Sequence, residues 1–289
     1  MPLIGLLLKS GTHSGLSAPL VWRWQTATLL LLLPIWAVGQ AQTPVLVKAS
    51  QQVPVVGTNV PDPTLADRLA KPAGADNVPT ALPARTVDPR IIPLFGERSK
   101  TPRQIEDEIN FLTDCDQNFS SRQEASRFFT ARGWEYIAEA RLDTAAYRFN
   151  LAFLADDKNP DVYWGLGVVS YQRGQLTEAV RLLTRGVALA DTNAVILTDL
   201  ATVELEQYQA KADTASLTDA REHLQKALFL NPANAPAYAK LSIASYLQAD
   251  YRTAWTYLHK AYRIDLAIID LTYVQELLAK EPDPTGVFK

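Results

Sequence analysis

The sequence predicts an all-α protein built from a stack of similar helix pairs. Helical periodicity of the apolar residues begins at Thr101 and continues almost to the end of the chain. The stretch 160–193 holds two amphipathic helices separated by Gly174, and its 34 residues match the period of a helix–turn–helix repeat. Small residues recur at two matched positions in four successive stretches. A generic amphipathic bundle has no reason to place them so, and we therefore expect an α-solenoid.

The stretch 160–193 shows how each pair is expected to form. Asn159 can cap the first helix, and Pro160 suits its first turn, where a missing N–H costs nothing. Gly174 ends this helix, and a second helix with one apolar stripe follows over 176–190. Gly167 and Ala179 are expected to face each other. Because neither carries a bulky side chain, the two helices can cross closely there.

The first 41 residues have the order of a secretory signal peptide. They contain no acidic residue, Lys9 and Arg23 precede an apolar run over 27–38, and small residues lie before a possible cleavage point at Gln42. The apolar run is shorter than the ~20 residues that span a bilayer. We expect cleavage of 1–41 and an exported protein that is periplasmic, envelope-associated or secreted. The alternative is an uncleaved membrane anchor.

Residues 42–100 differ in character because nine prolines interrupt them. No helix runs far between such closely spaced prolines, and each proline removes a strand hydrogen bond. The composition predicts a mostly disordered or extended linker. The stretch 91–96, with the sequence IIPLFG, is too apolar for a solvated linker. We expect this piece to dock on the helical part of the chain.

Helical segments then follow to the end of the chain. An N-terminal flanking helix is expected over 101–120, with Thr101 as its cap and Pro102 in its first turn. Four repeats follow over 126–159, 160–193, 194–234 and 235–268, and a helix over 269–281 would cap the apolar face of the last repeat. The third repeat is seven residues longer than the second. Either both of its helices lengthen by about a turn or a loop protrudes.

The recurring small residues form four expected pairs: Gly133 with Ala145, Gly167 with Ala179, Ala201 with Ala220, and Ser242 with Ala254. The stretch 160–193 adds further pattern residues: Tyr163, Leu166, Tyr171, Leu183 and Gly186. In this pattern the chain resembles the tetratricopeptide repeat (TPR) family over 126–268, in the form of a secreted or envelope protein of bacterial type. The resemblance implies a right-handed α-solenoid of about four helix pairs with flanking helices.

The sequence carries no signature of catalysis, of a metal site or of nucleic-acid binding. Its net charge is −3, whereas nucleic-acid binders are normally basic. The single cysteine, Cys115, excludes an intrachain disulfide and a cysteine-based zinc site. His223 and His259 occupy non-equivalent places, and the acidic run 106–108 reads as a solvated first turn. We therefore expect no enzyme, no cofactor, no metal and no nucleic-acid partner.

TPR folds usually present the inner faces of their first helices as a groove for peptides or proteins. The resemblance therefore implies a non-catalytic scaffold that binds a protein or an extended peptide segment in a concave groove. Here the groove positions form an aromatic and aliphatic strip, and the Lys and Asn clamp that holds a terminal carboxylate in the family is missing from them. The expected groove residues are Thr130, Trp134, Ile137, Trp164, Val168, Tyr171, Thr198, Thr202, Leu205, Ala239, Ile243 and Tyr246.

Other interpretations stay open. The protein could be a structural or assembly element that binds through its ends or its convex face, or an accessory subunit of an envelope enzyme. The strip itself could hold a partner or the chain's own stretch 91–95, which could instead cover the end of the first helix pair. We expect a partner in the groove and the linker at that end. Membrane contact is expected only if the apolar run at 27–38 is not cleaved.

Overall fold

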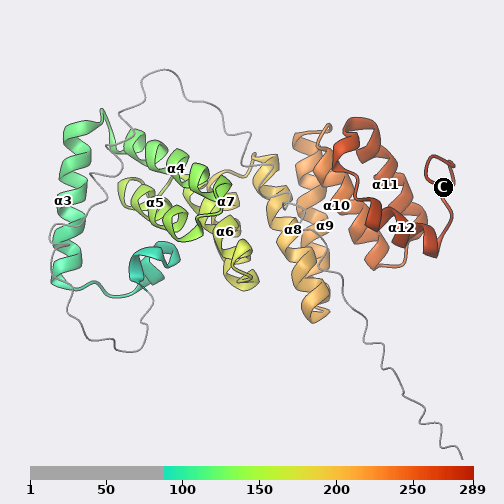
Figure 1. The fold of residues 1–289 in the computed structure, drawn as a ribbon, viewed down its shortest axis with the longest axis horizontal. Helices are drawn as coiled ribbons and strands as arrows, with labels where there is room; N and C mark the ends of the chain where they lie inside the picture. The colour runs from blue at the N-terminus through green and yellow to red at the C-terminus, as the bar shows by residue number, and fades with distance from the viewer. Residues whose placement is uncertain (1–87) are drawn as a thin grey trace, which may run out of the picture. The chain divides into compact units, whose positions relative to one another are not determined.

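The structure is a computed structural model that describes residues 88–289, and every regular element within them is a helix (Figure 1). The chain divides into two units, Met1–Gln42 and Thr43–Lys289, and all the described residues belong to the second. The prediction of an all-α solenoid is confirmed for this part of the chain. The expected signal peptide and most of the expected linker lie outside the described residues.

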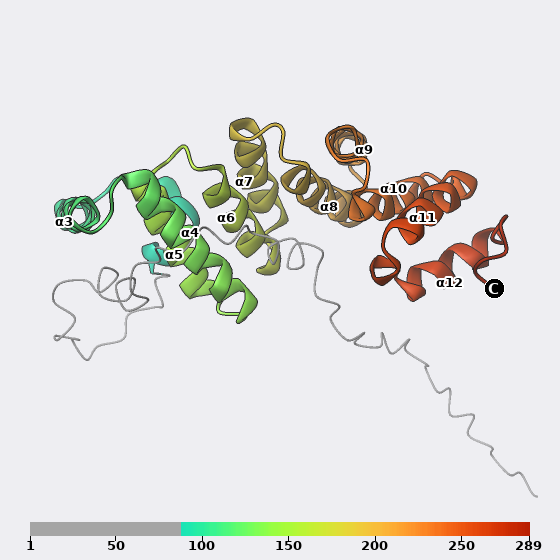
Figure 2. The ribbon, with the colours of Figure 1, turned by 90° about the horizontal axis from the view of Figure 1, so that it is seen from above.

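Ten α-helices form the described part, and eight of them make four antiparallel pairs. Each of these eight helices contacts its own pair partner most, and the second helix of each pair packs on the first helix of the next pair, so that the pairs follow one another in sequence order (Figures 1 and 2). The pairs are α4 (Arg122–Ala138) with α5 (Leu142–Ala155), α6 (Pro160–Gln172) with α7 (Leu176–Leu189), α8 (Ala194–Lys211) with α9 (Thr214–Leu230), and α10 (Ala235–Leu247) with α11 (Tyr251–Ile264).

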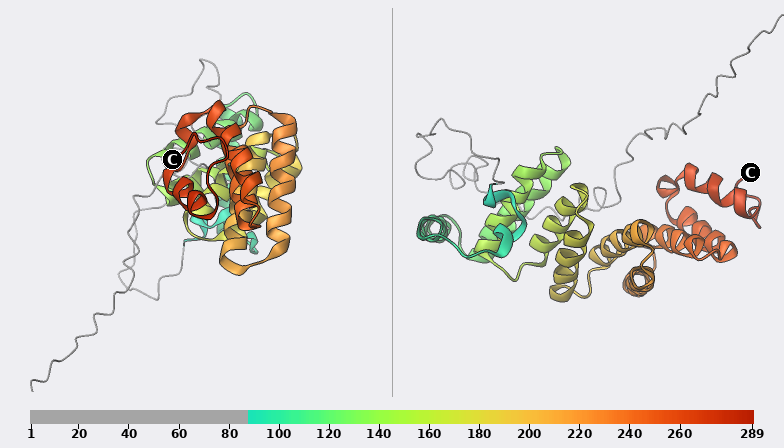
Figure 3. Two further views of the ribbon diagram at one scale, coloured as in Figure 1. Left: turned by 90° about the vertical axis from the view of Figure 1, so that its right-hand side faces the viewer. Right: turned by 90° about the horizontal axis from the view of Figure 1, so that it is seen from below.

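Three short 3-10 helices and two flanking α-helices complete the described fold. The segments η1 (Pro89–Ile91) and η2 (Pro93–Glu97) precede α3 (Pro102–Asn118), while η3 (Leu266–Ile268) and α12 (Leu271–Lys280) follow α11. Views from the side and from below show α12 beside α11 (Figure 3). Among the described residues, no helix combines the length and the apolar character needed to cross a bilayer.

Local signals explain most of the helix starts. Thr101 and Gln104 form a reciprocal capping box at α3, and the Asn159 side chain accepts a hydrogen bond from the Asp161 N–H at α6. The helix α4 starts at Arg122, four residues before the expected repeat boundary at 126. Ser121 caps it by accepting a hydrogen bond from the Glu124 N–H, which satisfies one of the free amide groups at the helix start.

The third pair is longer because both of its helices lengthen. Helices α8 and α9 have 18 and 17 residues, whereas α6 and α7 have 13 and 14. The turn between α8 and α9 consists of only Ala212 and Asp213, with Ala212 in the left-handed conformation at φ 54°. The seven extra residues therefore extend the packed surface of this pair, and the alternative of a protruding loop is wrong.

Small residues let the helices of a pair approach closely. The Ser242 hydroxyl donates a 2.7 Å hydrogen bond to the main-chain oxygen of Ala254, so these two expected partners meet directly. A Cβ placed on Gly167 would lie 2.7 Å from the Leu183 side chain. A glycine also allows close contact between neighbouring pairs: a Cβ on Gly165 of α6, which the repeat pattern did not single out, would lie 2.2 Å from the Phe149 ring of α5.

The C-terminal end of the stack is covered as expected for a capping helix. Val274 and Leu277 of α12 pack with Trp255 and Leu258 of α11 in one buried cluster. The last residues then fold back on α11, where the Phe288 ring stacks on Trp255 at 5.9 Å between ring centroids. His259 takes part in this packing through a 2.8 Å contact between its Nε2 and the Asp283 carboxylate.

Candidate functional site

The structure places most of the expected groove residues inside the protein. Eight of the twelve are at most 6% exposed: Thr130, Trp134, Ile137, Trp164, Val168, Thr198, Thr202 and Leu205. They are buried because α4 packs on α6, α8 packs on α10, and side chains join α6 to α8. The exposed apolar strip expected along the first three repeats is therefore wrong. The four residues that remain half-buried are Tyr171, Ala239, Ile243 and Tyr246.

Two of the buried residues serve the joints between successive pairs. The Thr130 hydroxyl accepts a 3.3 Å hydrogen bond from the Asn159 amide, and the Thr198 hydroxyl accepts one of 3.0 Å from the Asn234 amide. Each asparagine also caps the helix that follows it. The threonines thus hold the next pair in place, and they are not available as ligand contacts.

Two hydrogen bonds from aromatic side chains to carboxylates bridge α6 and α8. Trp164 Nε1 donates to Asp199 Oδ2 at 2.7 Å, and seven residues further on in both helices the Tyr171 hydroxyl donates to Glu206 Oε1. Asp199 is fully buried, and its Oδ1 has no hydrogen-bond partner among the described residues. Burial raises the pKa of Asp199 to about 7, although the Trp164 hydrogen bond and the Lys240 charge oppose this shift.

Lys240 of α10 brings a positive charge to the same face. It is half-buried, and it makes no hydrogen bond or ion pair with any residue that the structure describes. Burial lowers its pKa, while the charges of Glu206, Asp199 and Asp270 act in the opposite direction. Ile243 and Tyr246 follow at helical spacing on α10 and are half-buried.

We call Glu206, Lys240, Ile243 and Tyr246, together with the buried Asp199, the Lys240 surface. Its three charged members were missed by sequence reasoning, which took the groove residues from the repeat pattern and selected only uncharged ones. Each of them directly follows an expected groove residue: Asp199 follows Thr198, Glu206 follows Leu205, and Lys240 follows Ala239. A charged residue in the middle of the apolar stretch 194–203 was the available signal, because an unexplained charge in a buried helix has to meet a partner.

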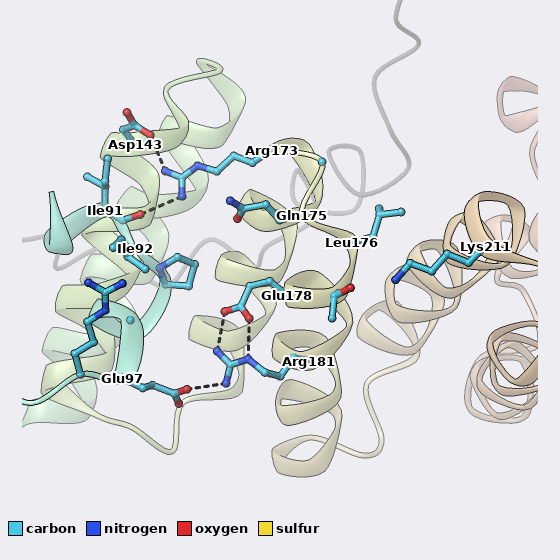
Figure 4. A pocket seen from close by; sticks show the side chains of 15 residues that line it. Ile91, Ile92, Glu97, Asp143, Arg173, Gln175, Leu176, Glu178, Arg181 and Lys211 are labelled. Atoms are coloured by element: carbon cyan, nitrogen blue, oxygen red, sulfur yellow. Dashed lines mark hydrogen bonds and ion pairs between the residues drawn. The ribbon is translucent and has the colours of Figure 1, made fainter. Parts of the chain in front are cut away.

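A second site holds part of the chain itself. Residues 88–97, the docked segment, lie along α5 and near α7, the second helices of their pairs (Figure 4). The buried Asn150 side chain accepts a 2.9 Å hydrogen bond from the Leu94 N–H and donates to the main-chain oxygens of Arg90 and Ile92 at 2.8 and 2.7 Å. The expectation that this stretch docks is confirmed, but it lies neither in the first-helix strip nor at the end of the first pair.

Side chains fix both halves of the docked segment. The Leu94 side chain is 2% exposed, and Arg173 donates a 3.0 Å hydrogen bond to the Ile91 oxygen. The Glu97 carboxylate accepts from Arg181 at 2.9 Å and from Arg185 at 2.5 Å. Beside the segment lies an open cleft of about 900 Å³ that extends past the start of α7 to Lys211 (Figure 4).

Groups for acid–base or metal chemistry do not gather at either site. No group of three or more His, Cys, Asp or Glu residues that could hold a metal ion exists within 88–289. Burial raises the pKa of the Cys115 thiol to about 12, which makes it a poor nucleophile. His223 contacts Glu204 at 2.9 Å and His259 contacts Asp283, so both histidines serve packing contacts.

Comparison with known proteins finds likeness only among solved structures. No protein-family profile matches the sequence, and no curated protein matches it. The structure of TTC0263, a thermophilic TPR protein in Thermus thermophilus, is 20% identical and has a TM-score of 0.47, with 54% of this chain and 88% of that chain covered.

Two further structures show the same degree of likeness. YrrB, described as a TPR protein with an unusual peptide-binding site, is 17% identical over 60% of this chain and 86% of its own, with a TM-score of 0.44. The pilF protein of Pseudomonas aeruginosa is 19% identical over 58% of this chain and 79% of its own, with a TM-score of 0.46.

Proposed function

We propose that this protein is a non-catalytic scaffold that binds an extended segment of a partner protein on the Lys240 surface. The observation that carries this proposal is Lys240 itself, a half-buried cation with no ion pair or hydrogen bond to the described residues. Removing a charged group from water without a partner is costly. A bound segment that offers an oxygen to the Lys240 amine would offset this cost.

The surroundings of Lys240 define the chemistry of such a segment. A main-chain carbonyl or a carboxylate of the partner would meet the amine, and an apolar side chain of the partner would lie against Ile243 and Tyr246. Glu206 has one carboxylate oxygen bonded to the Tyr171 hydroxyl and a second that is free to accept a hydrogen bond. An extended chain provides alternating donors and acceptors, which suits a surface that carries both kinds of group.

Substitution of Lys240 tests this proposal. Lys240→Met keeps most of the side-chain length and removes the charge, and Lys226→Met makes the same change at an exposed place on the second helix α9. Both variants are crosslinked in the native host and purified, and the captured proteins are quantified against wild type. We expect the Lys240 variant to lose the captured partner and the Lys226 variant to retain it. Equal capture by both variants would show that the partner binds elsewhere.

We further propose that the protein acts outside the cytoplasm, in the cell envelope or beyond it. The order of charged, apolar and small residues over 1–41 supports this. Amino-terminal sequencing and intact mass of protein from the native host test it, since the mature chain should begin near Gln42. A mass that retains the apolar run at 27–38 would instead support a membrane anchor.

A further inference from the structure

The site that holds the docked segment binds its main chain through Asn150, in addition to the side chains of Leu94 and Glu97. Asn150 uses all its hydrogen-bonding groups on three main-chain atoms, those of Arg90, Ile92 and Leu94. Asn150 is fully buried, and so is the main-chain contact it makes with Leu94. A helical surface that binds a chain through its backbone in this way can bind another segment with a similar path, a suitable apolar residue and a carboxylate.

The docked segment adopts an unfavourable backbone conformation. Leu94, Phe95, Gly96 and Glu97 are consecutive residues with φ of 51°, 56°, 73° and 52°. Single left-handed residues are common at helix ends, but a run of them is disfavoured for residues that carry a Cβ. Three of these four residues carry one. The contacts of Asn150, Arg181 and Arg185 therefore hold the segment against its own backbone preference.

The docked segment also leaves part of its site open. The cleft of about 900 Å³ is bounded on one side by Ile92, Pro93 and Glu97 of the segment. On the other side it is bounded by Gln175 and Thr177 at the start of α7, and it reaches Lys211 at the end of α8 (Figure 4). A longer chain could follow the path of the segment and continue into this space.

We propose that this site on α5 and α7 is a second peptide-binding site, which the docked segment occupies and from which a partner segment can displace it. The partner would place an apolar residue in the position of Leu94 and a carboxylate near Arg181 and Arg185. A partner that makes these contacts without a left-handed run avoids the strain. This gives it an advantage over the chain's own segment.

A second copy of this chain is a poorer occupant. Its segment 88–97 has the same sequence and would need the same left-handed run to make the same contacts. Exchange of the segment between two copies would therefore not relieve the backbone strain. A short acidic segment of a different protein, which need not adopt the left-handed run, fits the observations better.

A peptide in solution tests the exchange on the full chain. The probe is a fluorescent peptide with the sequence of residues 88–97 and a glycine in place of Phe95, which reduces its own strain. Fluorescence anisotropy measures its binding to wild type and to Gly96→Ala. A Cβ on Gly96 would meet nothing closer than 3.4 Å, so this variant adds strain to the docked segment with little steric conflict.

We expect Gly96→Ala to bind the probe about fivefold more tightly than wild type does, because its own segment is released more readily. Gly286→Ala is the matched control, since Gly286 has φ +68° and nothing within 4 Å of its Cβ. It should bind the probe as wild type does. Adding Asn150→Ala to Gly96→Ala should remove this gain in affinity for the probe, because Asn150 makes the main-chain contacts of the site.

Leu94→Asp provides an independent release of the segment, because Leu94 is buried. Circular dichroism and thermal melting confirm that each variant is folded before binding is measured. If folded Gly96→Ala and Leu94→Asp both bind the probe no better than wild type, the segment is a permanent part of the fold and the proposal is wrong. If Leu94→Asp does not fold, the comparison of Gly96→Ala with Gly286→Ala decides.

Discussion

The indole N–H of Trp164 donates a 2.7 Å hydrogen bond to the Asp199 carboxylate, and both side chains are buried where α6 meets α8. Trp164 is therefore a structural joint rather than an open contact for a ligand. Loss of this donor would leave the buried Asp199 carboxylate without any hydrogen-bond partner among the described residues. A buried carboxylate such as that of Asp199 lowers the stability of the protein. Residues that lower stability are often retained in proteins because they contribute to function.

Asp199 should make the protein less stable at high pH. Because burial raises its pKa from 3.8 to about 7, the folded state binds this proton more tightly than the unfolded state. Stability is then full below about 3.8 and declines as the pH rises through about 7. Asp199→Asn should remove this decline. The free energy of unfolding should rise by at most roughly 4 kcal/mol at about pH 8 and should change little at about pH 4.

Urea unfolding at the two pH values measures this gain. Asp107→Asn is a suitable control, because Asp107 is exposed on α3. It should change stability equally little at both pH values. A gain for Asp199→Asn that does not depend on pH would mean that Asp199 is not the group responsible.

The hydroxyl of Thr198 should stabilise the joint between the third and fourth pairs. Thr198→Val keeps the shape and leaves the buried Asn234 amide without this acceptor. We expect a loss of about 1–2 kcal/mol in the free energy of unfolding. Thr256→Val, at an exposed hydroxyl that bonds only the main-chain oxygen of Arg252, should cost much less. If thermal or chemical unfolding showed equal losses of stability for Thr198→Val and Thr256→Val, Thr198 would not stabilise the joint between the third and fourth pairs.

Gly165 should tolerate no larger residue. A Cβ there would lie 2.2 Å from the Phe149 ring, so Gly165→Ala should destabilise the protein by about 1–3 kcal/mol through overpacking. Gly186→Ala in α7 is the matched comparison, since its nearest neighbour would be 3.4 Å away. Helix propensity makes this second change neutral or stabilising by up to about 1 kcal/mol. Differential scanning calorimetry compares the two, and a tolerated Gly165→Ala would show that the ring does not pack there.

His223 should stabilise the third pair in its charged form. The hydrogen bond to the Glu204 carboxylate raises the pKa of His223, in spite of an opposing effect of burial. Its contribution is complete below the unfolded value of 6.5 and is lost as the pH rises through the higher folded value. The stability difference between wild type and His223→Gln should therefore shrink from about pH 6 to about pH 9. A constant difference in chemical unfolding would exclude the charged pair.

Sequence reasoning predicted what local signals determine. Asn159 and Pro160 mark the start of α6 by their own chemistry, and the small residues Ser242 and Ala254 meet as their spacing implied. The start of α4 was also predictable, since Ser121 and Glu124 have the spacing of a capping box. The repeat period shows that the third repeat has seven extra residues, but it could not predict whether they lengthen the helices or form a loop.

The binding surfaces were harder to predict because they depend on distant partners. Nothing in the local sequence distinguishes Asn150 from other helix residues. Only the fold brings it into contact with Leu94, which lies 56 residues earlier. The burial of Trp134 and Trp164 depends on how closely successive pairs stack, with their rings 4.8 Å apart. Repeat phase fixes which face of a helix a residue occupies, but it does not fix whether a neighbouring helix covers that face.

The most direct test places a photo-crosslinking amino acid on the proposed surface. A benzophenone side chain at Ile243 lies beside Lys240 on the first helix α10, and the same group at Phe229 lies on the second helix α9, where the native side chain is 85% exposed. Irradiation in the native host should crosslink a partner protein from position 243 and not from position 229. Crosslinking of the same partner from position 229 alone, or equally from both positions, would contradict binding on the Lys240 surface.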